Sequence, residues 1–135
     1  MPAGYSGTPL INKLGIKENF SIRLVNDPAN YLKLLGKLPT GITFVQNDRE
    51  PADFIHFFVT RSTILKKQLP SLKKQLKKSG MLWISWPKKS SKMETDVDEN
   101  FIRDTGLAAG LVDVKVCAVD ETWSGLKFVY RLKDR

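Results

Sequence analysis

The sequence predicts a three-layer α/β domain with a mostly parallel sheet of about six strands and a C-terminal antiparallel hairpin. An apolar run at residues 81–86 lies between Gly80 and Pro87, which is typical of a central strand buried on both faces. A second apolar run covers 54–59. Helical and strand patterns alternate along the chain, as they do in β-α-β units. The 135 residues suit one domain with one core, so we expect a single domain over 1–135.

The predicted elements follow an N-terminal arm in the order β-α-β-β-α-β-α-β-β. The arm covers 1–19 and includes one helical turn closed by Gly15. The predicted strands cover 20–26, 42–46, 53–60, 80–86, 112–119 and 125–132, and the predicted helices cover 28–38, 62–78 and 96–109. The first strand is indicated by the alternation of Phe20, Ile22 and Leu24. Asp27 is a suitable helix N-cap and Pro28 a suitable first helical residue.

The helix predicted over 62–78 has a leucine stripe at helical spacing, which should face the core. Pro70 lies inside this helix, so we expect a kink or a fresh start there. Asp96 and Glu99 resemble a capping box that opens the next helix, and Gly110 ends it. Apolar and polar residues alternate in 112–119, which indicates a strand exposed on one face at an edge of the sheet.

Positive charge is concentrated in the middle of the chain. No Asp or Glu occurs between Phe54 and Met93, although the net charge is +8, so the remainder is slightly acidic. The cations of this span are Arg61, Lys66, Lys67, Lys73, Lys74, Lys77, Lys78, Lys88, Lys89 and Lys92. This asymmetry favours an anionic partner, whether a nucleic acid, a phosphorylated small molecule or an acidic protein. A solvated helix face is the alternative explanation.

Several classes of protein and site are excluded or disfavoured by composition. No apolar run approaches the roughly 18 residues that span a bilayer, and the N-terminus does not resemble a signal peptide, so no membrane partner is expected. A lone cysteine, Cys117, allows no intrachain disulfide and favours a reducing cytoplasm. Cys117 and the single histidine, His56, cannot supply a typical zinc ligand set. We expect His56 to be a core residue with a satisfied hydrogen bond.

The segment after the 80–86 strand is the best candidate for a binding site. Ammonium and hydroxyl groups at the carboxyl end of a central strand suit a phosphate or a carboxylate, although an ordinary polar loop explains them as well. Trp123 either caps the sheet or stacks on a ligand, and Asp120 and Glu121 either bind ligand hydroxyls or pair with the lysines. The candidate ligand-binding residues are Asn26, Asp27, Thr60, Arg61, Trp86, Lys88, Lys89, Ser90, Ser91, Asp120, Glu121 and Trp123. No catalytic or metal-binding residue is indicated.

A helix followed by an Ala-Gly-Leu-Val turn at 109–112 and a final hairpin resembles the second half of a class I methyltransferase, a Rossmann-like fold. In that fold the last strand inserts antiparallel between its two predecessors. The resemblance implies the sheet order 42–46, 20–26, 53–60, 80–86, 125–132, 112–119. The segments 86–91 and 120–124 should then be neighbours at one edge of the sheet.

Three sequence blocks carry a second resemblance, which covers essentially the whole chain. The blocks Tyr5-Ser-Gly-Thr-Pro-Leu, Trp86-Pro-Lys-Lys-Ser-Ser and Asp120-Glu-Thr-Trp-Ser-Gly resemble those of a bacterial family of small cytoplasmic domains of unknown function. This resemblance implies the fold and transfers no activity.

The chain departs from true methyltransferases where those enzymes bind S-adenosylmethionine. Their turn after the first strand is rich in glycine, whereas residues 25–29 contain none. Asp48 is a weak match to the acidic residue that holds the ribose, and a short loop at 47–52 replaces a helix–strand–helix segment. We therefore expect a non-catalytic binding domain for a small anionic or nucleotide-like ligand, with no tight binding of S-adenosylmethionine. The alternatives are a nucleic-acid or acidic-protein binder that uses the 62–78 helix, which we do not favour, and an atypical methyltransferase.

Overall fold

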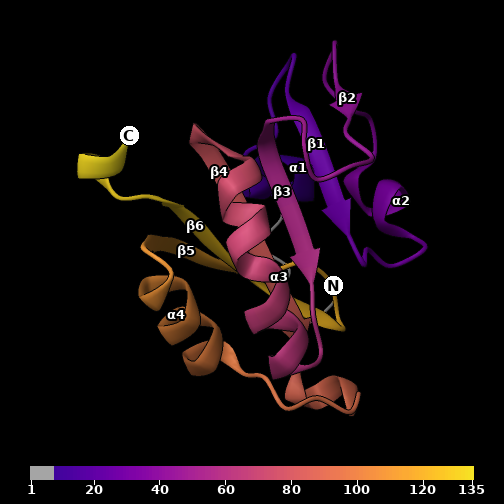
Figure 1. The fold of residues 1–135 in the computed structure, drawn as a ribbon. Helices are drawn as coiled ribbons and strands as arrows, with labels where there is room; N and C mark the ends of the chain where they lie inside the picture. The colour runs from indigo at the N-terminus through magenta and orange to yellow at the C-terminus, as the bar shows by residue number, and fades with distance from the viewer. Residues whose placement is uncertain (1–7) are drawn as a thin grey trace.

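The computed structural model describes residues 8–135, so the first seven residues of the expected arm lie outside it. It contains a six-stranded sheet in the order β2-β1-β3-β4-β6-β5 (Figure 1). The strands are β1 (Ser21–Val25), β2 (Thr43–Phe44), β3 (Ala52–Phe58), β4 (Leu76–Pro87), β5 (Leu111–Ala118) and β6 (Trp123–Tyr130). The helices are α1 (Leu10–Leu14), α2 (Tyr31–Leu35), α3 (Ser62–Gln75) and α4 (Glu99–Ala108), with short 3₁₀ turns η1 (Lys89–Ser91) and η2 (Leu132–Asp134).

The strand order is the one predicted from the sequence. Strands β2, β1, β3 and β4 are parallel neighbours, and β6 runs antiparallel between β4 and β5. The two continuous apolar runs form the central strands β3 and β4. The alternating segment forms the edge strand β5, where Val114 and Val116 are about half exposed. Across 8–135, no helix is both long and apolar enough to cross a bilayer.

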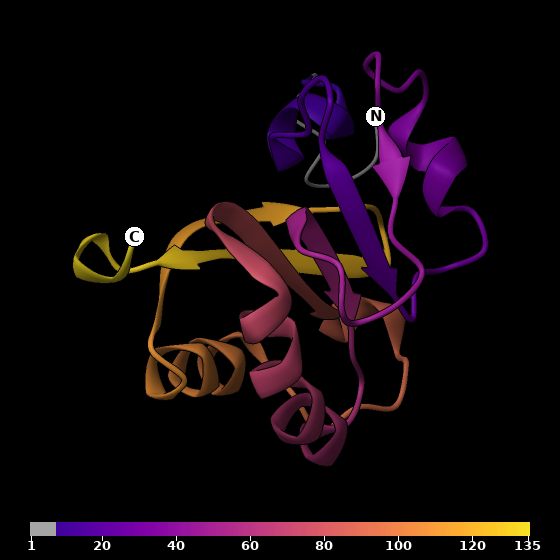
Figure 2. The ribbon, with the colours of Figure 1, turned by 45° about the horizontal axis from the view of Figure 1, so that its top comes forward.

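Helices cover both faces of the sheet, which explains why its middle strands carry long, mainly apolar runs. Helices α3 and α4 lie on one face and α1 and α2 on the other (Figure 2). Alternate side chains of β3 and β4 enter different cores. Ile55 and Ile84 pack with the leucines of α3, whereas Phe58 and Trp83 pack with α1 and α2. The indole N–H of Trp83 also donates to the Leu14 carbonyl across 2.9 Å, which fixes the end of α1 on the sheet.

Three helices differ from the sequence prediction in at least one boundary. Helix α2 begins at Tyr31 rather than at Pro28, because Asn26 adopts a left-handed conformation and a turn bonds the Tyr31 amide to the Pro28 carbonyl. Asp27 is therefore not its N-cap. The helix ends early at Gly36, whose φ is +75°.

Helix α3 begins at Ser62 and contains Pro70, as predicted, but it ends at Gln75 rather than at residue 78. The buried Gln75 side chain donates to two carbonyls of the 47–50 loop and accepts a bond from Arg23. This anchor turns the chain out of the helix. Leu76 then pairs with Ala52 as the first residue of β4.

The predicted capping box at Asp96 is wrong. Helix α4 begins at Glu99, and its N-cap is Asp98, whose carboxylate accepts from the Phe101 amide at 2.8 Å. The Asp96 carboxylate instead accepts from the amide and hydroxyl of Ser62, at 2.7 and 2.9 Å. Asp96 thus caps the N-terminus of α3, which has no cap from its own preceding residue.

Candidate functional site

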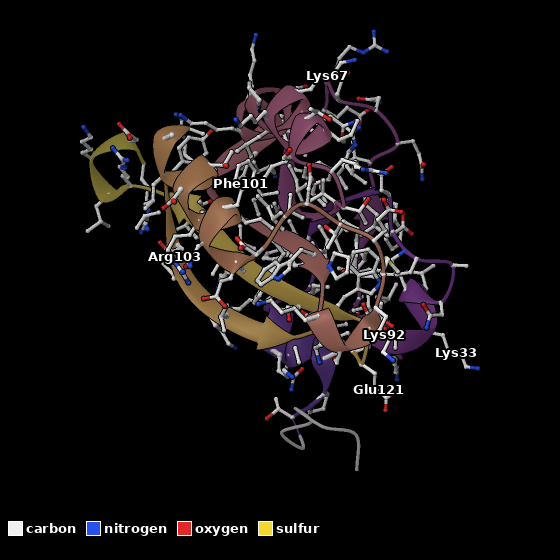
Figure 3. The ribbon with its side chains drawn as sticks, turned by 90° about the horizontal axis from the view of Figure 1, so that it is seen from below. Lys33, Lys67, Lys92, Phe101, Arg103 and Glu121 are labelled. Atoms are coloured by element: carbon white, nitrogen blue, oxygen red, sulfur yellow. The ribbon has the colours of Figure 1, made fainter. Side chains whose placement is uncertain are left out.

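The carboxyl ends of the central strands lie together at one end of the sheet, which we call the carboxyl edge. The arrowheads of β1 and β3 point to it in Figure 1. At this edge Pro87 pairs with Trp123, and the Lys88 amide donates to the Thr122 carbonyl at 2.8 Å. The predicted proximity of the 86–91 and 120–124 segments is therefore confirmed. Figure 3 shows Lys92 and Glu121, from these two neighbouring regions, projecting at the same side of the molecule.

The segment after β4 is ordered by its own hydrogen bonds. Pro87 ends the strand, and the η1 turn follows at once. The Ser91 hydroxyl donates to the Lys88 carbonyl at 2.6 Å and accepts from the Met93 amide. Lys92 then takes a left-handed conformation that redirects the chain. The Ser91 hydroxyl is thus used inside the loop, whereas Lys89 and Ser90 are exposed.

The hairpin turn between β5 and β6 is ordered by Asp120. Its carboxylate accepts from the Thr122 and Trp123 amides, both at 2.8 Å, so it is occupied by the backbone of the turn. Trp123 packs edge-on against Phe58, with ring centroids 5.0 Å apart. For both residues these contacts favour a structural role over a ligand-binding role. Asp120 shapes the turn, and Trp123 caps the sheet. Glu121 remains exposed at the tip.

Two cavities lie on either side of the segment after β4. The large cavity, of about 680 Å³, is lined by Trp86, Pro87, Lys88, Lys89, Met93, Thr95, Asp96, Val97, Asp98, Glu99, Asn100 and Ser124. The small cavity, of about 350 Å³, is lined by Lys88, Ser90, Ser91, Glu121 and Thr122. Lys88 contributes to both. This lysine therefore lies where the two cavities adjoin.

The large cavity is lined by two lysines, Lys88 and Lys89, and by three carboxylates that have partners elsewhere. Asp98 caps α4, and Glu99 forms an ion pair with Arg103 at 2.7 Å. Asp96 accepts from Ser62, and these bonds lower the pKa of its carboxyl group. By contrast, neither Lys88 nor Lys89 forms an ion pair with any residue of 8–135. The acidic groups of the cavity thus keep their charge but have partners of their own, whereas its two ammonium groups have no ion-pair partner within 8–135.

Six of the predicted site residues line neither cavity: Asn26, Asp27, Thr60, Arg61, Asp120 and Trp123. The Thr60 carbonyl accepts from the Thr95 hydroxyl and the Asp96 amide, and the exposed Arg61 lies 3.9 Å from Glu94. The 94–96 segment therefore crosses the end of β3. The binding role of the predicted set stays a prediction.

Sequence reasoning missed one wall of the large cavity, which is formed by residues 93–100. These residues were predicted only as a polar loop and the start of a helix. The signal was topological, because a connection from the carboxyl end of β4 to the next helix has to cross this edge of the sheet.

His56 is a core residue, as predicted. It is fully buried, and its ring nitrogens lie 2.7 Å from the Tyr31 hydroxyl and 2.7 Å from the Ser85 hydroxyl. Burial lowers the pKa of His56 to about 3, so the ring is neutral at physiological pH. Burial and, next, the Asp27 carboxylate raise the pKa of Tyr31. No group of His, Cys, Asp and Glu side chains within 8–135 is arranged to hold a metal ion.

No family model matches the sequence, and no curated protein matches it either. Solved structures do match. A SAM-dependent methyltransferase from Aquifex aeolicus is 19% identical with a TM-score of 0.61, over 88% of this chain and 86% of that one. The DhpI–SAH complex is 9% identical with a TM-score of 0.62, over 91% and 81%. Magnesium protoporphyrin IX methyltransferase from Synechocystis PCC 6803, with bound SAH, is 10% identical with a TM-score of 0.56, over 90% and 78%.

These likenesses define the class of fold. The chain has a class I methyltransferase-like, Rossmann-like fold, as the sequence predicted. Identities this low do not carry an activity with them. Membership of the bacterial family of unknown function, expected from the three sequence blocks, stays a prediction.

Proposed function

We propose that the protein is a non-catalytic domain that binds a small anionic or nucleotide-like ligand at the carboxyl edge of its methyltransferase-like sheet. One observation carries the proposal: Lys88 and Lys89 line the large cavity without a carboxylate partner, although three carboxylates lie in the same wall. An anion would complete this arrangement through charge-assisted hydrogen bonds.

The rest of the lining suggests what else the ligand carries. Trp86, Pro87, Met93 and Val97 give the large cavity an apolar side, and its volume of about 680 Å³ is within the range of small-molecule sites. A phosphate or carboxylate joined to a ring or short chain would fit both kinds of wall. Glu121 in the small cavity could accept bonds from hydroxyl groups such as those of a ribose.

The same lining supports binding rather than catalysis. A general base needs a free acceptor with a pKa near the working pH. The aspartates of the large cavity cap helices, and Glu99 is paired with Arg103. The single histidine is buried elsewhere in the core.

Replacing Lys88 with glutamine should weaken the binding of adenosine monophosphate about 10-fold or more, because one charge-assisted hydrogen bond is lost. Titration calorimetry of the wild type with adenosine monophosphate, pyrophosphate and uncharged adenosine would measure this. We expect the two phosphorylated probes to bind and adenosine to bind weakly or not at all. Lys37→Gln is the matched control, since Lys37 is exposed and lines neither cavity. Equal losses in both variants, or no binding of either phosphorylated probe, would reject the site.

S-adenosylmethionine should bind with a dissociation constant no tighter than about 1 mM, or about −4 kcal/mol. Its methionine part needs close approach to the turn after β1, and here that turn carries the side chains of Asn26 and Asp27. Calorimetry with S-adenosylmethionine and S-adenosylhomocysteine tests this expectation. A dissociation constant near 1 μM, about −8 kcal/mol, would instead promote the second candidate, an atypical methyltransferase, which the similarity to SAH-bound structures supports.

A further inference from the structure

A second charged region lies at the opposite, amino end of β4, above α3 in Figure 1. A groove of about 400 Å³ is lined there by Pro70, Lys73, Lys74, Lys78, Tyr130 and Asp134. We call it the amino-edge groove. It shares no lining residue with the two cavities at the carboxyl edge.

Several cations in and around the amino-edge groove are held in place by neutral groups. Lys73 donates to the Ala109 carbonyl at 2.7 Å, and the Lys78 ammonium lies 4.3 Å from the centre of the Tyr130 ring. Arg131 and Arg135 donate to backbone carbonyls at 2.9 and 2.8 Å. A carbonyl or an aromatic face orders a cation without cancelling its charge. The charged groups of these lysines and arginines therefore remain available to an anion. Their side chains also lose less conformational freedom when the anion binds.

Exposed lysines without partners extend this positive surface. Lys67, Lys74 and Lys133 are exposed and have no hydrogen-bond or ion-pair partner within 8–135. Asp134 is the one acidic residue among those that line the groove in the described chain. The surface therefore carries a strong local excess of positive charge.

The surface is also long enough for an extended partner. Helix α3 has 14 residues, which correspond to a length of about 21 Å. Beyond it, β4 bulges away from β3, since Ala52 and Phe54 pair with Leu76 and Met81. This bulge carries Lys78 and also Lys77, which is paired with Asp53 at 3.2 Å. One strand of a nucleic-acid duplex presents a phosphate about every 3.4 Å along its axis, so the helix alone spans roughly six phosphates.

We propose that the amino-edge groove and the exposed lysines beside it bind the phosphodiester backbone of a nucleic acid. An acidic protein is the less suitable partner, because stable protein interfaces centre on aromatic and aliphatic anchors. The groove offers only Pro70 and a buried Tyr130 for that purpose. This proposal is independent of the ligand site at the carboxyl edge, and either can fail alone.

Fluorescence anisotropy with a labelled 30-base-pair DNA duplex tests the proposal. The wild type should bind at about 50 mM salt, and its affinity should fall steeply as salt rises. The triple variant Lys67→Gln, Lys74→Gln, Lys133→Gln should reduce the slope of log affinity against log salt by about 2 to 3 and lower affinity about 10-fold or more. Circular dichroism checks that the variant folds, which is expected because all three side chains are exposed.

The matched control removes the same net charge from elsewhere, by Lys17→Gln, Lys33→Gln and Lys37→Gln. These lysines are exposed around α1 and α2, on the other face of the sheet, and Figure 3 shows Lys33 and Lys67 projecting on different sides of the molecule. We expect the control to bind almost as the wild type does. Absence of wild-type binding, or equal loss in both triple variants, would overturn the proposal. Competition by polyglutamate as strong as that by unlabelled DNA would overturn it in favour of an acidic protein.

Discussion

Replacing Trp83 with alanine should lower the free energy of unfolding by about 3–5 kcal/mol. Trp83 is fully buried in β4, beneath α1 and α2. Its removal leaves a large cavity and deprives the Leu14 carbonyl of the indole N–H that it accepts from. Domains of this size are stable by only about 5–15 kcal/mol, so the loss is a large fraction of the total. Urea denaturation followed by circular dichroism would measure it.

Two further variants separate the cavity from the hydrogen bond. Trp83→Phe keeps most of the ring volume but loses the N–H, and we expect it to cost less than Trp83→Ala. Trp123→Ala removes a half-buried tryptophan at the end of the sheet and should also cost less. A cost below about 1 kcal/mol for Trp83→Ala would show that α1 does not depend on this contact.

Acidification from pH 7 to pH 5 should lower the stability of the protein by about 2 kcal/mol through His56 alone. The unfolded histidine takes up a proton below its ordinary pKa of 6.5, whereas burial lowers the folded pKa to about 3. A falling pH therefore favours the unfolded state. The contribution is present in full above pH 6.5 and is lost progressively down to about pH 3.

Because the chain has a single histidine, nuclear magnetic resonance can follow its ring directly. The ring proton shifts of the folded protein should stay constant between pH 8 and pH 5, and a midpoint near 6.5 would contradict the expectation. In His56→Gln, the dependence of unfolding free energy on pH should become flatter over the same window, although the variant also loses its bonds to Tyr31 and Ser85.

The sheet could be predicted because the burial of each strand determines its pattern of apolar residues. The buried runs in β3 and β4 are apolar except for His56 and Ser85, since both faces are covered, whereas β5 alternates, since it lies at the edge. These two patterns agree with the strand order that the methyltransferase resemblance implied. The proximity of Lys88 to Thr122 followed from that order.

The boundaries of the helices depend on contacts that local patterns do not contain. Asp96 matches a local capping box, yet it caps a helix that begins thirty-four residues earlier, at Ser62. Gln75 ends α3 because of carbonyls in the distant 47–50 loop. Propensity at Leu76 favours a longer helix, but pairing with Ala52 places this residue in a strand instead.

The candidate site was predictable only in part for the same reason. Lys88 and Lys89 directly follow a buried strand, so their place at the edge could be inferred. The path of the 93–96 segment could not, because it depends on the hydrogen bonds that Thr95 and Asp96 make to Thr60. That path adds Met93 and Val97 to the lining of the large cavity, which does not include Arg61.

The position of β6 has a consequence for how the chain is made. The strand of this sheet that is made last, β6, lies between β4 and β5 and supplies Leu126 and Phe128 to the core. Until it emerges, the nascent chain holds two unpaired strand edges, which are prone to association with other chains. The sheet can therefore close only after residues 123–130 have left the ribosome. A truncation before β6 should yield an insoluble product rather than a shortened functional one.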